Sequence, residues 1–181
     1  MKRLIEALMQ PRLPWRALLA HYMTAVARDD YSYTRLSTRR GDPAIFPSLK
    51  SDEVNVLVGL DVSGSVSDKE LNNCLSEINA IKGQMRARIT LIACDAEIIK
   101  GFPCVFEPWE EAILPKEIAG GGTTDFRPVF NWAEQQDKPP DIVIYFTDTQ
   151  GNFPAYAPDY QVIWLVKGKG EVPWGQRVQL N

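Results

Sequence analysis

The 181-residue chain has a single histidine, His21, and only three cysteines, Cys74, Cys94 and Cys104. One histidine is too few for a His-rich metal site or for the HExxH motif of zinc proteases. An odd number of cysteines without close spacing argues against a disulfide framework and against a zinc ribbon. We therefore expect free thiols in the reducing environment of the cytoplasm.

Long apolar runs are also missing, since no stretch approaches the ~20 residues that a membrane-spanning helix needs. A secretory signal is not expected either, because Glu6 interrupts the apolar stretch that follows Lys2 and Arg3. With 45% hydrophobic and 24% charged residues, the chain is unlike disordered, collagen-like or coiled-coil proteins. We therefore expect a globular cytoplasmic protein that makes no membrane contact.

The net charge of −3 is the sum of two parts of the chain that have opposite sign. Residues 1–50 hold nine Lys or Arg against four Asp or Glu, whereas residues 51–181 hold eleven against nineteen. The acidic second part argues against a nucleic-acid-binding surface. The basic first part can dock on the second or on an acidic partner. We expect a helix with an extended basic tether at 1–50 and a folded domain at 51–181.

Residues 14–28 predict the helix of the first part. Their apolar side chains repeat at helical spacing and would form one stripe, consisting of Trp15, Leu18, Leu19, Tyr22, Met23 and Val26. His21 falls outside this stripe, so a surface position is expected. Gly41-Asp42-Pro43 then predicts a break before the second part begins.

The second part predicts alternating strands and helices. Apolar runs indicate buried strands at 54–60, 88–94, 141–146 and 161–166, and shorter strands at 96–100 and 104–106. Helices are expected after the capping-box pair Ser67 and Glu70 and at residues 126–136. The core face of the first of these helices consists of Leu71, Cys74, Leu75, Ile78 and Ile81. This order predicts a Rossmann-like, three-layer α/β sandwich with a central, mostly parallel sheet.

Three polar clusters follow strands or lie in a Gly-rich loop. They are Asp61/Ser63/Ser65, Thr123/Thr124/Asp125 and Thr147/Asp148. Ligands of open α/β sheets bind at the carboxyl ends of the strands, so clusters that follow neighbouring strands would meet there. Every candidate donor is an oxygen atom, which favours Mg²⁺, with Mn²⁺ or Ca²⁺ as alternatives, over zinc or copper. Neutral hydroxyl ligands would leave much of the ion's charge for an outside anion such as a partner's carboxylate.

These motifs resemble the metal-ion-dependent adhesion site (MIDAS) of von Willebrand factor A (VWA) domains, which integrin I domains share. The resemblance implies that Ser63, Ser65 and Thr124 are hydroxyl ligands. It also implies that Asp61 and Asp148 contact the ion directly or through water. Thr123 is the alternative to Thr124, and Asp125 is a candidate for supporting the site from outside the ligand shell.

A wider resemblance covers most of the chain. The Trp15 helix, the residue 28–33 tether, the residue 120–128 loop and Pro173-Trp174-Gly175 are similar to the C-terminal, VWA-like portion of a bacterial family of predicted metallopeptidases. Longer members carry an N-terminal zinc-motif segment, which a chain with one histidine is not expected to supply. Related VWA proteins often occur beside MoxR-type AAA+ ATPases, so the resemblance implies such an ATPase as a partner.

The preferred function is therefore a non-enzymatic, cation-dependent protein-interaction module that binds an Asp or Glu of its partner. One alternative is a Mg²⁺-dependent hydrolase that acts on phosphate esters. Another is a VWA scaffold without metal, in which Asp61, Ser63 and Ser65 only cap the following helix.

Other prominent residues are expected to be structural. The tryptophans at positions 109, 132, 164 and 174 are expected to pack against the core. Residues 107–111 are expected to form a solvated acidic face, and Cys94 to be an inert packing residue.

Overall fold

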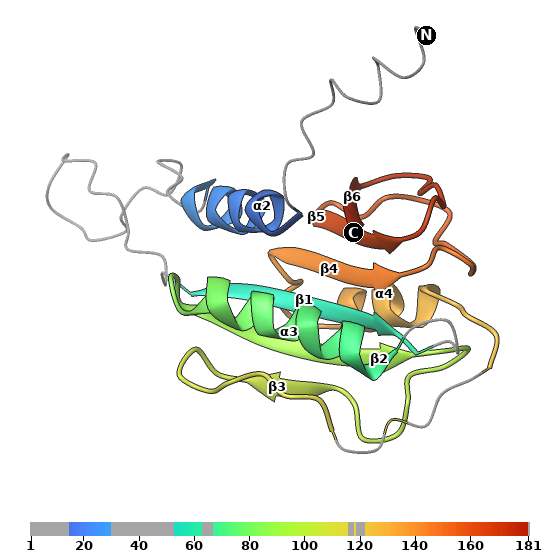
Figure 1. The fold of residues 1–181 in the computed structure, drawn as a ribbon, viewed down its shortest axis with the longest axis horizontal. Coiled ribbons are helices and arrows are strands. Elements are labelled where there is room, and N and C mark those ends of the chain that lie inside the picture. Colours follow the sequence, from blue (N-terminus) through green and yellow to red (C-terminus); the bar gives the residue numbers. More distant parts are fainter. Residues whose placement is uncertain (1–14, 30–52, 63–66, 116–117, 119–121, 181) are drawn as a thin grey trace, which may run out of the picture.

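A computed structural model describes residues 15–29, 53–62, 67–115, 118 and 122–180 (Figure 1). In chain order the elements are α2 (Trp15–Asp29), β1 (Val54–Asp61), α3 (Asp68–Lys82), β2 (Ala87–Cys94), β3 (Cys104–Phe106), α4 (Arg127–Glu134), β4 (Ile142–Thr147), β5 (Gln161–Lys167) and β6 (Gln176–Leu180). Among these residues, no helix has the length and apolarity to cross a membrane.

The strands form one six-stranded sheet in the order β3-β2-β1-β4-β5-β6. All neighbouring strands are parallel except β3, which pairs antiparallel with β2 at one edge. All six residues of β4 and seven of the eight in β1 are buried, as expected for parallel strands that are covered on both faces. The predicted α/β class with a mostly parallel sheet is confirmed.

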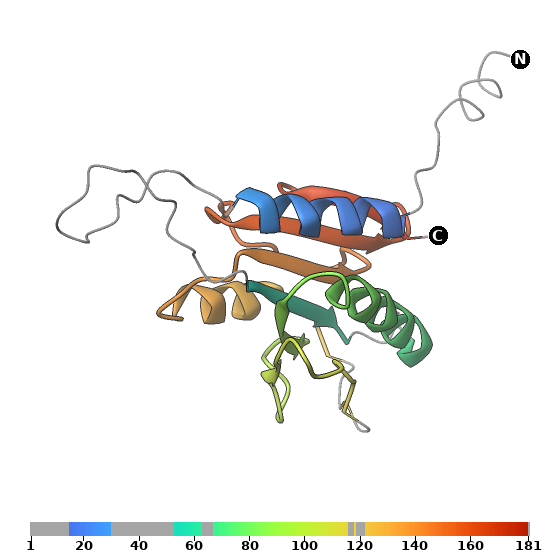
Figure 2. The same cartoon turned by 90° about the vertical axis from the view of Figure 1, so that its left-hand side faces the viewer.

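Helices cover both faces of the sheet (Figure 2). Buried side chains of α2 and α3 share one core cluster with residues such as Val56 and Ile144. The other face is covered by α4, whose Val129 and Phe130 join a second cluster rich in aromatic rings. Each cluster lies between the sheet and its helices, so the molecule has the three layers that the sequence predicts.

Helix α3 has the beginning and the core face that the sequence predicts. Its capping box is present: the Glu70 carboxylate accepts hydrogen bonds from the backbone N–H (3.0 Å) and the hydroxyl (2.7 Å) of Ser67. Lys167 at the end of β5 donates to the same carboxylate at 2.9 Å. These hydrogen bonds, that from Lys167 above all, lower the pKa of Glu70 to about 2. The five side chains of the predicted core face are all buried.

One strand prediction is wrong, and one strand was not predicted. Residues 96–100 form no strand, because the chain turns back after Cys94 and makes a single antiparallel bridge to Ile98. The Asp95 carboxylate accepts the N–H of Glu97 at 3.2 Å within that turn. Strand β6 was not expected: in this edge strand only Val178 is buried, which leaves a weak apolar signal.

The tryptophans and His21 divide between the core and the surface. Trp164 is fully buried, as predicted, and Trp132 and Trp174 are partly buried against the same cluster. The prediction for Trp109 is wrong, because 76% of this residue is exposed. His21 is exposed, as its position outside the apolar stripe predicts.

Helix α2 belongs to the core of the sheet domain. Leu19 and Met23 have no exposed surface and lie in the cluster that α3 shares with the sheet. Arg16 also forms an ion pair with Glu77 of α3, with 2.7 Å between Nε and Oε1. Of the two roles open for the first part of the chain, packing on the main body is the one that α2 adopts.

We predict that Leu19→Ala lowers the free energy of unfolding by about 2–5 kcal/mol, because it leaves a cavity in a packed core. Urea unfolding followed by circular dichroism measures the change. The control is His21→Ala, which alters an exposed residue of the same helix and should change stability by no more than ~0.5 kcal/mol. Equal effects of the two substitutions would show that α2 is not part of the core.

Candidate metal centre

The candidate site lies where the strand order of the sheet reverses. From β1 the chain adds β2 and β3 on one side, and it then adds β4, β5 and β6 on the other. The carboxyl ends of the two strands beside such a reversal border the crevice in which open α/β sheets bind ligands. Strands β1 and β4 are neighbours in the sheet (Figure 1). Leu60 pairs with Phe146, so Asp61 and Thr147 follow side by side at the ends of these strands.

Asp61 is fully buried and accepts hydrogen bonds from two threonines. The Thr147 hydroxyl donates to Oδ2 at 2.8 Å. The Thr124 hydroxyl donates to Oδ1 at 3.4 Å. Both threonines are themselves buried, with Thr147 at 0% and Thr124 at 8% exposure. Two of the predicted polar clusters therefore meet at Asp61, although 63 and 86 positions separate their threonines from it along the chain.

Backbone hydrogen bonds on both sides hold the loop that carries Thr124. Asp125 donates its N–H to the Asp95 carbonyl, just after β2, at 2.7 Å. Phe126 donates its N–H to the Asn152 carbonyl, in the loop after β4, at 3.0 Å. Since β1 lies between β2 and β4, this loop crosses the end of β1 and brings Thr124 to Asp61.

Close packing against the loop after β4 fixes the position of Thr124. Asn152 donates its N–H to the Thr124 carbonyl at 3.3 Å. Gly151 lies so near that a Cβ there would be 2.8 Å from Thr124 Cγ2 and 2.9 Å from the Thr124 carbonyl oxygen. The buried ring of Phe126 anchors the same loop from below, with its centroid 5.1 Å from that of Tyr145.

The chain after β4 bends sharply at the site. Asp148 Oδ1 accepts the N–H of Gln150 at 2.9 Å. Thr149 adopts a left-handed backbone conformation with φ of 69°, which is unfavourable for a β-branched residue. Its N–H donates to the Thr147 hydroxyl at 2.9 Å, so Thr147 holds both this bend and Asp61.

Asp125 supports the loop and the beginning of α4. Its Oδ1 accepts the backbone N–H of Arg127 at 3.0 Å and the Arg127 Nε at 2.9 Å. The hydrogen bond from the Arg127 side chain is the largest cause that lowers the pKa of Asp125. Both oxygens of this carboxylate are therefore hydrogen-bonded to Arg127 at the beginning of α4.

Of the remaining candidate ligands, some lie in the described part of the chain and others do not. The Thr123 side chain is exposed, so the geometry favours Thr124 as the threonine that faces Asp61. Ser63 and Ser65 lie outside the described residues. Thr147 belonged to a predicted polar cluster without an assigned role, and its hydroxyl donates to the Asp61 carboxylate. In the sequence, Thr147 could have been recognised by its position directly after a buried strand.

The donors at this edge fit a hard cation. Within the described part of the chain, no three His, Cys, Asp or Glu residues form a group that could hold a metal ion. The oxygen donors that converge are instead the Asp61 carboxylate and the hydroxyls of Thr124 and Thr147. Asp148 follows Thr147 directly, and its Oδ1 accepts the N–H of Gln150. Cys94 lies at the same edge, but burial raises its thiol pKa to about 12, so it carries no thiolate that would attract a soft metal.

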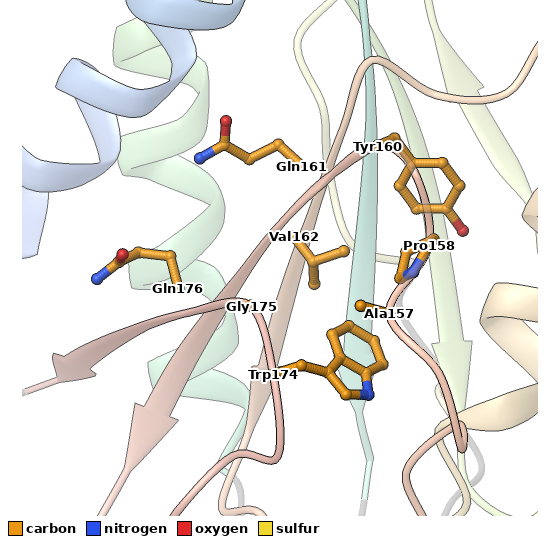
Figure 3. Close-up of a pocket in the computed structure, with 8 residues that line it drawn as sticks. All are labelled: Ala157, Pro158, Tyr160, Gln161, Val162, Trp174, Gly175 and Gln176. Carbon is orange, nitrogen blue, oxygen red and sulfur yellow. The ribbon is translucent and has the colours of Figure 1, made fainter.

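A separate shallow pocket of about 290 Å³ lies at the other end of the strands (Figure 3). Its lining includes Gln161 and Gln176, which are the first residues of β5 and β6. Asp61 is the last residue of the parallel strand β1, so this pocket is not part of the candidate metal centre. Trp174 forms one wall, and its Nε1 donates to the Pro154 carbonyl at 3.1 Å.

We predict that Thr147→Val lowers the free energy of unfolding by about 1–3 kcal/mol, because it removes a hydrogen-bond donor from a buried carboxylate. Thr147→Ser keeps the hydroxyl and should retain most of that stability. Chemical denaturation of both variants beside the wild-type protein measures the difference. Equal stability of the Val and Ser variants would mean that the hydroxyl does not hold Asp61.

Gly151→Ala should destabilise the protein by about 1–3 kcal/mol, because the added methyl group collides with Thr124 and Phe126. The control is Gly83→Ala at the end of α3, where φ is −62° and the nearest atom to an added Cβ is 3.5 Å away. That variant should be neutral or slightly more stable. Thermal unfolding of the two variants tests the contrast, which would fail if Gly151→Ala melted at or above the temperature of Gly83→Ala.

The chain is similar to an uncharacterized protein of Thermotoga maritima, with 27% identity over 150 residues. The alignment covers 82% of this chain and 36% of the relative, so the chain spans about a third of that protein's length. Among solved structures it is similar to the ArnB paralog VWA2 from Sulfolobus acidocaldarius. That similarity has 18% identity and a TM-score of 0.47, over 64% of this chain and 35% of the other.

A family model adds to these pairwise similarities. The model describes a VWA-like domain, designated DUF2201, and matches residues 56–181. The matched range begins at the third residue of β1 and covers the rest of the sheet. Because it covers more than half of the sequence, the chain belongs to the family of VWA-like domains designated DUF2201.

Proposed function

We propose that the protein is a divalent-cation-dependent interaction module. The VWA-like domain indicates a protein-interaction or scaffold role. The finer proposal is that Ser63, Ser65, Thr124, Asp61 and Asp148 hold a Mg²⁺ ion that binds a carboxylate of a partner protein. The observation that carries it is the convergence of threonine hydroxyls on buried Asp61 at the reversal of the strand order.

The chemistry of the residues supports this proposal. Hydroxyl and carboxylate oxygens are the ligands that Mg²⁺ prefers. A shell with several neutral hydroxyls would leave positive charge on the ion, so an Asp or Glu side chain of a partner would complete it. The hydrogen bond from Thr147 holds Asp61 in one orientation, and such supporting contacts tune a metal ligand.

The same geometry favours binding over catalysis. Asp61 is fully buried and accepts two threonine hydroxyls, which does not suit a base that must take a proton from a substrate. Cys94 is buried, and its raised pKa keeps the thiol protonated, which does not suit a nucleophile. A MoxR-type AAA+ ATPase remains the partner that the family resemblance implies.

We expect Mg²⁺ to raise the melting temperature of the wild-type protein, because a ligand that binds only the native state stabilises it, by about 2.7 kcal/mol at one hundred times its Kd. Asp61→Asn and Ser65→Ala should each weaken the affinity at least ~10-fold. The readout is thermal unfolding during titration with Mg²⁺, Mn²⁺ or Ca²⁺.

The matched controls change an aspartate and a serine that lie outside the candidate site. Asp137→Asn and Ser76→Ala alter exposed residues and should keep the full metal response. Equal stabilisation of the wild type, Asp61→Asn and Ser65→Ala would refute the proposed site. Stabilisation of none of them at millimolar cation would favour the metal-free scaffold.

The partner's carboxylate can be tested with short random peptides displayed on phage, selected in Mg²⁺ and eluted with EDTA. Enriched peptides should share an Asp or Glu, and replacing it by Asn or Gln should abolish binding. Peptides that bind equally well in EDTA would contradict the proposal. Mg²⁺-dependent hydrolysis of p-nitrophenyl phosphate that is lost in Asp61→Asn would instead support the hydrolase.

A further inference from the structure

A rigid turn displays Trp109 at the surface. Glu110 donates its N–H to the Glu107 carbonyl at 2.9 Å, and Glu107 donates its own N–H to Glu110 Oε2 at 2.8 Å. Pro108 stands at the second position, where its fixed φ favours a β-turn. Trp109 occupies the third position and is 76% exposed.

Three residues of two elements, β2 and α3, anchor this turn. Arg88 of β2 pairs with the Glu107 carboxylate, with 3.3 Å between Nη2 and Oε1. Lys82 of α3, which is only 5% exposed, donates its Nζ to the Glu110 carbonyl. Asn79 of α3 makes two hydrogen bonds to the backbone of Ala112, at 2.7 Å and 2.9 Å. The exposed tryptophan therefore stands on a framework that needs no rearrangement to bind.

Exposed apolar surface is concentrated in this segment. Of the four large apolar side chains exposed among the described residues, three fall between positions 105 and 113: Val105, Trp109 and Ile113. Ala112, between the last two, is buried at 1% exposure and fixes the segment to the body. A tryptophan in a preorganised position is the residue type that most often dominates a protein interface.

The charge around Trp109 selects the partner. Residues 105–113 contain three glutamates, Glu107, Glu110 and Glu111, and no lysine or arginine. Because Arg88 pairs with Glu107, the negative charge at the surface comes from Glu110 and Glu111. Both Glu110 and Glu111 are exposed. The complementary surface is an apolar pocket with lysine or arginine side chains at its rim, because opposite charges at the edge of an interface favour association.

The turn lies at the end of the sheet opposite the candidate metal centre. Phe106 pairs with Ile89, near the beginning of β2, and Trp109 follows it. Asp61 pairs with Cys94 at the other end of the same strand. The Trp109 turn and the candidate metal centre therefore lie at opposite ends of the sheet and share no residue.

We propose that the segment Val105–Ile113 is a docking surface for a second protein partner, which receives Trp109 in an apolar pocket with a basic rim. This interaction does not depend on the metal ion. The protein would then connect two partners, one at each end of its sheet.

The test selects displayed random peptides on the full chain in the presence of EDTA. We expect enriched peptides to combine apolar residues with lysine or arginine, and to bind less tightly as the salt concentration rises. Trp109→Ala should weaken their binding at least ~10-fold. Tyr156→Ala is the matched control, because this aromatic residue is 87% exposed elsewhere and its loss should leave the affinity unchanged.

Because the Trp109 side chain is mostly exposed, the Trp109→Ala variant should melt at the wild-type temperature. Glu111→Gln is a second variant, and it should reduce the salt dependence of peptide binding. Failure to enrich any peptide whose binding needs Trp109 would overturn the proposal, as would peptides rich in Asp or Glu. Sedimentation equilibrium that showed a dimer dissociated by Trp109→Ala would also overturn it, since a second copy of the chain would then be the occupant.

Discussion

Asp61 places a carboxylate at the end of β1 with no exposed surface. A buried carboxylate is costly unless hydrogen bonds compensate for the lost water. Thr147 donates to it from β4, and Thr124 donates to it from the loop before α4. Three segments far apart in the chain must therefore come together for Asp61 to be stabilised. The arrangement of the candidate centre is thus tied to the stability of the fold.

An aromatic layer on the α4 face supports this arrangement. The Tyr145 ring lies across β1 at Gly59, where any Cβ would be 2.5 Å from Tyr145 Cδ2. Phe126 packs edge-on against Tyr145 and Trp164. The loop that carries Thr124 is therefore anchored in the core directly beneath its exposed end.

The molecule has different surfaces at the two ends of its sheet. One end carries Asp61 and oxygen donors that suit a hard cation. The other carries Trp109 on a turn fixed by α3 and β2. Helix α2 completes the core on the α3 face through Leu19 and Met23, although the family match begins only at residue 56. The structural unit therefore extends beyond the matched range and includes a helix from the basic part of the chain.

The sequence by itself determined the class of fold and the edge of the sheet at which Asp61 and Thr147 lie. Continuous apolar runs predict parallel strands, and Asp61 and Thr147 each follow such a run directly. The resemblance already preferred Thr124 to Thr123, and the tertiary structure supplies the physical reason: hydrogen bonds to Asp95 and Asn152 set the orientation of that loop, so that Thr124 faces Asp61. The tertiary structure alone decided the burial of α2, the exposure of Trp109 and the pairing of β6. Local patterns determine periodicity and strand ends, whereas the direction of a side chain depends on contacts between residues distant in the chain.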